Sequence, residues 1–163
     1  MRGKYTLLYL YISVLATCVL SACEQRTIFS QYRHTSSSGW EKNAPVTLST
    51  NVIKEDGTYA EEIGVCINGE YPFKALTLII EQTRYPAFET WSDTLECQLI
   101  DEAGNATGQG VSQYQYVFPL KTLRLHQGDS LDITIRHDMK REILPGIVNV
   151  GLRISSLHQY AGK

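Results

Sequence analysis

The chain has little net charge, few cysteines and no apolar run long enough for an ordinary membrane-spanning helix. Its 163 residues include 15 lysines and arginines against 17 aspartates and glutamates, which gives a formal net charge of −2. This balance provides no basic field for the phosphates of nucleic acid, so nucleic acid is excluded as a partner. The length suits one domain of ordinary size, and a second folded domain is not expected.

Recognisable catalytic and metal-binding signatures are missing as well. The four histidines do not follow the spacing of metal ligands, and no Gly-x-Ser-x-Gly nucleophile motif occurs. The adjacent carboxylates of Glu61 and Glu62 would point to opposite faces of a strand, so they cannot act together as acid and base. We therefore expect no enzymatic activity, no cofactor and no bound metal.

The N-terminal segment has the features of a secretion signal. Arg2 and Lys4 form a short positive segment, and the 16 residues from 5 to 20 are uncharged and mostly apolar. A membrane-spanning helix needs about 20 apolar residues, so this run is better sized for a signal peptide. We expect residues 1–22 to be the signal peptide that is removed.

The end of this segment matches the lipobox of bacterial lipoproteins, a leucine followed by two small residues and a cysteine. Here it reads Leu20, Ser21, Ala22 and Cys23. Signal peptidase II requires small residues before the cut and a cysteine whose thiol already carries diacylglycerol. Acyl chains contribute about 0.8 kcal/mol per buried methylene, which is ample for durable attachment to a membrane. Cys23 is accordingly the expected lipidation site, followed by a polar, lipid-anchored tether over residues 23–44.

From residue 45 onward, apolar side chains recur at every second position, as in half-buried strands. The expected inward positions are Val46, Leu48 and Val52; Ile63, Val65 and Ile67; Leu76, Leu78 and Ile80; Leu95, Cys97 and Leu99; Tyr114, Tyr116 and Phe118; Leu131, Ile133 and Ile135; and Val148, Val150, Leu152 and Ile154. The only helix candidate is residues 138–143, which could equally be irregular. Strands with one apolar face must pack sheet against sheet. We expect an all-β domain over residues 45–163, a jelly-roll-like or related β-sandwich of about 7–9 antiparallel strands.

Two cysteines remain after the signal peptide and the lipidated residue are set aside. Alternation turns Cys97 inward, whereas Cys66 lies between the inward Val65 and Ile67 and therefore points outward. Side chains on opposite faces cannot meet the distance that a disulfide requires, so we do not expect a bridge between them.

Trp40 and Trp91, with neighbouring aromatic residues, are candidates for a platform on which sugar rings stack. Flat apolar sugar faces dock on aromatic rings, but packing of aromatic residues at the rim of a sandwich is the favoured explanation. The glycan-binding reading stays open as an alternative function.

Several segments in the mature chain carry a family resemblance. The two most specific are Asp-Thr-Leu-Glu-Cys at residues 93–97 and Leu-Pro-Gly-Ile at 144–147, the latter leading into Val-Gly-Leu-Arg at 150–153. Shorter ones are Trp-Glu-Lys at 40–42 and Tyr-Pro-Phe at 71–73. In this order, the segments resemble the GldH family of gliding-motility lipoproteins from Bacteroidetes.

The resemblance implies a non-enzymatic envelope lipoprotein, a structural or interaction component of the gliding machinery, which is linked to type IX secretion in this phylum. Its implied partners are the membrane, through the N-terminal lipid, and other gliding or secretion proteins of the envelope. Surface-exported lipoproteins of this phylum tend to carry several acidic residues after the lipidated cysteine, whereas here Glu24 is followed by Gln25 and Arg26. This favours the periplasmic face, with the outer membrane as the expected location.

Thr94 and Ser130 are candidate O-glycosylation sites. Each lies in an Asp-Thr/Ser-hydrophobic triplet, the pattern that Bacteroidetes use for O-glycosylation of exported proteins. Each also precedes an inward residue, so alternation is expected to turn both hydroxyls outward.

Overall fold

The structure, a computed structural model, describes residues 26–157, and this range contains eleven strands and no helix. The strands are β1 (Thr27–His34), β2 (Trp40–Glu41), β3 (Val46–Ser49), β4 (Gly57–Asn68), β5 (Ala75–Tyr85), β6 (Glu89–Gln98), β7 (Gln109–Gly110), β8 (Gln113–Leu125), β9 (Ser130–His137), β10 (Ile143–Leu144) and β11 (Ile147–Leu157). The helix candidate at residues 138–143 is not helical, and its last residue opens β10. The signal peptide and the lipobox lie outside the described residues.

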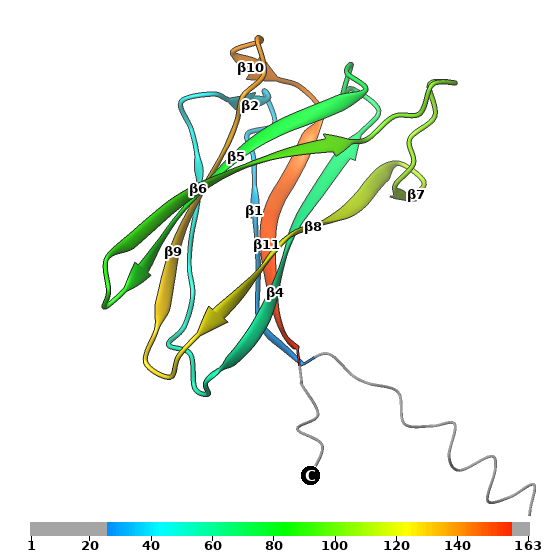
Figure 1. Cartoon of the computed structure of the whole chain (residues 1–163). Helices are drawn as coiled ribbons and strands as arrows, with labels where there is room; N and C mark the ends of the chain where they lie inside the picture. The colour runs from blue at the N-terminus through cyan, green and yellow to red at the C-terminus, as the bar shows by residue number, and fades with distance from the viewer. Residues whose placement is uncertain (1–25, 158–163) are drawn as a thin grey trace, which may run out of the picture.

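The strands form two antiparallel sheets that face each other (Figure 1). One sheet has the order β1-β11-β4-β8-β7 and the other the order β3-β9-β5-β6, while β2 and β10 pair separately. Leaving aside the two-residue β7, this is the strand arrangement of a jelly roll. The predicted all-β sandwich of jelly-roll-like type is therefore confirmed.

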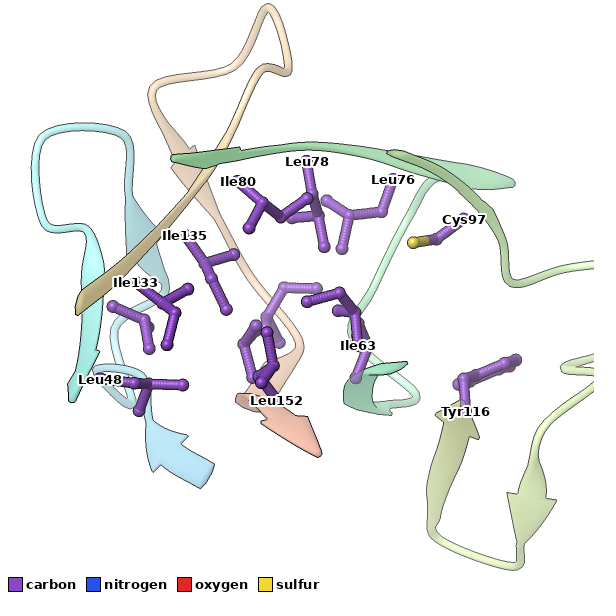
Figure 2. Packing of buried hydrophobic residues seen from close by; sticks show 14 of the residues in the cluster. Leu48, Ile63, Leu76, Leu78, Ile80, Cys97, Tyr116, Ile133, Ile135 and Leu152 are labelled. Carbon is purple, nitrogen blue, oxygen red and sulfur yellow. The ribbon is translucent and has the colours of Figure 1, made fainter. Parts of the chain in front are cut away.

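The core lies between the sheets and follows the predicted alternation. Figure 2 shows Ile63 and Leu152 of the first sheet facing Leu78, Ile80 and Ile135 of the second, and all five side chains are fully buried. Because each sheet can bury only one face against the other, the apolar positions of the seven predicted runs supply most of this core.

Two expected inward residues lie elsewhere. Val52 is 59% exposed, because β3 ends at Ser49 and the alternation does not extend to residue 52. The neighbouring Ile53 is buried instead. Val148 is half-buried, because the pairing of β11 with β4 shifts register between Ile147 and Asn149 and thereby buries Ile147.

The expected tether over residues 23–44 is wrong from residue 27 onward. Residues 27–34 form β1, which pairs antiparallel with β11 and adds an edge strand to the first sheet. Farther along the expected tether, Trp40 is only 2% exposed and belongs to the core. The folded domain therefore begins at Thr27. An edge strand needs only one hydrogen-bonded side, so polar side chains on β1 do not prevent it from pairing.

Tyr32 holds β1 against the outer face of its sheet. It lies in register with Gly151 of β11, which in turn lies in register with Gly64 of β4. The Tyr32 ring occupies the space that a Cβ on either glycine would need. An aromatic ring over strand glycines compensates for the missing side chains, so these two glycines and Tyr32 form one packing unit.

We predict that Gly64→Ala destabilises the domain by about 1–3 kcal/mol, because the new methyl group displaces the Tyr32 ring. In a Tyr32→Ala background the same substitution should cost less than about 0.5 kcal/mol, because the Tyr32 ring that the new methyl group would displace is absent. Urea unfolding of the four proteins in this double-mutant cycle measures the difference. An equal cost in both backgrounds would show that Tyr32 does not cover Gly64.

Candidate functional site

A group of polar side chains interrupts the apolar core between β4, β5, β6 and β8. We define this inter-sheet polar cluster as Glu61, Gln82, Trp91, Asp93 and Lys121. Glu61 and Gln82 are each 1% exposed, and the other three side chains are half-buried. Buried polar groups are costly unless they find partners, so a cluster of this kind is the first place to look for a role beyond packing.

The same alternation that builds the core turns most of these residues inward. Glu61 lies two residues before Ile63 in β4, and Gln82 lies two residues after Ile80 in β5, so each shares a strand face with an inward residue. Both residues therefore enter the space between the sheets, although neither is apolar. The pairing of Glu61 with Glu62 did not reveal this position, whereas the two-residue spacing from Glu61 to the inward Ile63 is the sequence signal that marks it.

Lys121 reaches the interior through a local irregularity in β8. Glu61 pairs with Lys121 but Glu62 pairs with Pro119, so Leu120 is the extra residue of a β-bulge. The bulge reverses the alternation in β8, and from Lys121 onward odd-numbered residues face inward. The sequence marks this shift, because the apolar residues are even-numbered from Tyr114 to Phe118 and odd-numbered at Leu123 and Leu125.

Two polar contacts join the sheets across the cluster. The Gln82 Nε2 atom of β5 donates a hydrogen bond to Glu61 Oε2 of β4 at 3.1 Å. Lys121 of β8 forms an ion pair with Asp93 of β6, and its Nζ lies 4.8 Å from the centre of the Trp91 ring. Directional contacts of this kind fix which positions on the two sheets lie opposite each other.

The environment of Glu61 favours its neutral form. Burial raises the pKa of Glu61 to about 7, against the smaller lowering effects of the Gln82 hydrogen bond and the charge of Lys121. The nearby charge of Asp93 raises this pKa further. Glu61 therefore takes up or releases a proton near neutral pH, inside the core, and does so where its Oε1 has no hydrogen-bond partner among the described residues.

Trp40 and Trp91 do not form a common stacking platform. Trp40 donates from its indole nitrogen to the carbonyl oxygen of Ala44 at 2.8 Å, and its ring forms a T-shaped pair with the His137 ring in the core. A buried ring cannot take up a sugar, so Trp40 does not serve the stacking role that was left open as an alternative. Trp91 is half-buried and lies beneath Lys121.

The other predicted sites have the following positions. Thr94 is exposed on β6, the edge strand of the second sheet, and Ser130 is half-buried where β9 begins. Cys66 and Cys97 are both buried free cysteines, and only Cys97 belongs to the core cluster. In residues 26–157 no three or more His, Cys, Asp or Glu side chains are grouped to hold a metal ion, and no helix could span a membrane.

Comparison with protein families gives a match over almost the whole folded domain. The family model described as GldH lipoprotein matches residues 27–154, which run from the first residue of β1 into β11. The chain belongs to the GldH lipoprotein family. The resemblance carried by the short sequence segments is thus confirmed, and the GldH match starts where the structure places the start of the fold.

Comparison with curated proteins found no match. Among solved structures, the globular domain of zebrafish complement 1qA aligns with 17% identity and a TM-score of 0.44, covering 83% of this chain and 99% of that one. Eiger TNF from S. frugiperda aligns with 12% identity and a TM-score of 0.36, covering 84% and 97%. A GH115 4-O-methyl-alpha-glucuronidase aligns with 11% identity and a TM-score of 0.43, covering 83% of this chain but 18% of that one. Similarity at this level supports no conclusion about function.

The raised pKa of Glu61 predicts a specific pH dependence of stability. Its folded-state pKa of about 7 lies above the ordinary value of 4.5, so the folded protein binds the proton more tightly than the unfolded chain does. The stabilising contribution of the protonated carboxyl is complete below pH 4.5 and declines as pH rises to about 7, by about 3 kcal/mol in total.

Urea unfolding between pH 4 and 8 tests this dependence in the wild type, Glu61→Gln and Glu62→Gln. Glu61→Gln should lack this decline, because the amide stays neutral throughout. Glu62→Gln is the matched control and should keep the decline, because Glu62 pairs with Arg153 outside the core. Parallel stability curves for the wild type and Glu61→Gln would contradict the assignment.

Proposed function

We propose that this GldH-family chain is a lipid-anchored, non-enzymatic component of the gliding machinery in the cell envelope, in a system linked to type IX secretion. The observation that carries the proposal is the family match over residues 27–154, together with the lipobox that precedes it. The chain would act through protein contacts with other gliding or secretion proteins.

The anchor in this proposal is the lipid on Cys23. The three preceding residues, Leu20, Ser21 and Ala22, form the recognition site for signal peptidase II. The location favoured by the residues after Cys23 is the periplasmic face of the outer membrane. The described fold supports a scaffolding role, because Glu61, the carboxyl group whose pKa is raised to about 7, is buried in the core. A substrate could not reach the Glu61 carboxylate without the two sheets moving apart.

A glycan-binding role receives less support than it did from the sequence. It relied on Trp40 and Trp91, of which the first is buried and the second lies beneath Lys121. O-glycosylation of Thr94 or Ser130 stays a prediction, and the exposed hydroxyl of Thr94 is the more accessible of the two.

Deletion of the gene in a gliding host should abolish colony spreading, and a wild-type copy should restore it. A Cys23→Ala copy should fail to restore spreading and should accumulate as unprocessed precursor without palmitate, because both acyl transfer and cleavage depend on the Cys23 thiol.

Cys18→Ala is the matched control, since Cys18 lies in the segment that is removed with the signal peptide. It should restore spreading and incorporate palmitate. Normal spreading after deletion would contradict the role in gliding, whereas palmitate incorporation by Cys23→Ala would contradict the anchor.

A further inference from the structure

The end of the sandwich where β1 begins is formed by connections that lie close together. Figure 1 shows the start of β1 and the end of β11 beside the connections β3–β4 and β8–β9. The β3–β4 connection, residues 50–56, is tied to the β8–β9 turn by hydrogen bonds from Ile53 N to Asp129 O at 2.7 Å and from Gly128 N to Ile53 O at 2.9 Å. We name this surface the β1-start end.

The turn between β5 and β6 belongs to the same end. Tyr85 of β5 pairs with Ser130, the first residue of β9, and Arg84 donates to the carbonyl oxygen of Arg124 at the end of β8. This turn carries Phe88, whose side chain is 74% exposed, and residues 50–56 carry the exposed Val52. Two large apolar side chains thus extend into solvent from a set of mutually bonded loops.

The length of chain before β1 places the lipid beside this end. Three residue steps separate Cys23 from Arg26, so the lipidated residue lies within about 11 Å of Arg26. The opposite end lies the length of β4 away, and a strand of 12 residues spans about 36 Å. A lipid on Cys23 therefore brings the β1-start end to the membrane and leaves the Asn68 end far from it.

The polar groups around Val52 suit a phospholipid headgroup. Arg26 and Lys54 are exposed and line one cavity of about 220 Å³ with Val52, so both cations can donate to lipid phosphates. The acids of the same loop are Glu55, which is exposed, and Asp56, whose carboxylate accepts a hydrogen bond from Gln127 N at 2.7 Å. Two cations beside two acids match a zwitterionic headgroup better than a strongly anionic one.

We infer that the β1-start end rests directly on the phospholipid surface, with Val52 and Phe88 in contact with the headgroup region. Exposed apolar and aromatic side chains gain stability at this boundary, and the adjacent cations add electrostatic attraction. The inference rests on the lipid anchor of the proposed function and extends it to an orientation: the sandwich stands on the membrane with the Asn68 end pointing away.

Fluorescent labelling of single introduced cysteines tests this orientation in the full lipidated protein. Val52→Cys and Phe88→Cys report on the β1-start end, Glu70→Cys on the opposite end, and His34→Cys on the exposed edge of β1. The native Cys66 and Cys97 are 2% and 0% exposed, so the introduced cysteines are the ones that react. Each protein is added to preformed phosphatidylethanolamine vesicles containing a minor fraction of phosphatidylglycerol, and quenching by aqueous iodide is measured.

The labels at Val52 and Phe88 should be quenched severalfold less after vesicle binding, while those at Glu70 and His34 stay as accessible as in detergent. Equal quenching at Val52 and Glu70 would overturn the orientation, and protection at His34 equal to that at Val52 would show a domain lying on its side. Vesicle flotation is measured in parallel. Failure to float with the vesicles would contradict the anchor itself, which separates that outcome from a wrong orientation.

Discussion

The antiparallel pairing of β1 with β11 is the constraint on which the rest of this molecule depends. It extends the first sheet to the edge on which Tyr32 covers Gly151 and Gly64, and it makes Thr27 the first residue of the fold. Because the family match also begins at residue 27, the strand is part of the family's domain. With β1 part of the first sheet, only three residues separate Cys23, the proposed lipidation site, from the first residue of the fold.

The inter-sheet polar cluster is a second constraint, and it works differently from the apolar core. Ile63, Leu78 and Leu152 could tolerate a small slide of one sheet over the other, because dispersion contacts are not directional. The Gln82–Glu61 hydrogen bond and the Lys121–Asp93 ion pair have no such freedom. Buried polar pairs often add little stability, so we expect their value here to be a unique alignment of the two sheets. A single, rigid surface suits the proposed role, in which the protein acts through contacts with partners.

How far the sequence predicts this structure depends on which physical signal each residue carries. Ile133 and Cys97 were assigned correctly to the core because alternation is strong wherever a strand buries one apolar face. β1 was missed because its apolar residues Ile28, Phe29 and Tyr32 do not alternate, and because its pairing partner β11 lies more than a hundred residues away. Glu61 could have been found, since it shares the parity of Ile63. Lys121 could also have been found, because the apolar residues around it change from even positions at Tyr114–Phe118 to odd positions at Leu123 and Leu125, on either side of the bulge.

Amide hydrogen exchange of residues 27–34 tests most directly whether β1 is an integral strand. The measurement uses the full lipidated protein, followed by proteolysis and mass spectrometry of the peptides from β1, β4 and β11. The account predicts that the β1 amides bonded to β11 exchange far more slowly than an unstructured chain of the same sequence, although faster than the central strand β4. Exchange of residues 27–34 at the unstructured rate, with β4 and β11 still protected, would show that this segment is a tether and would contradict the account.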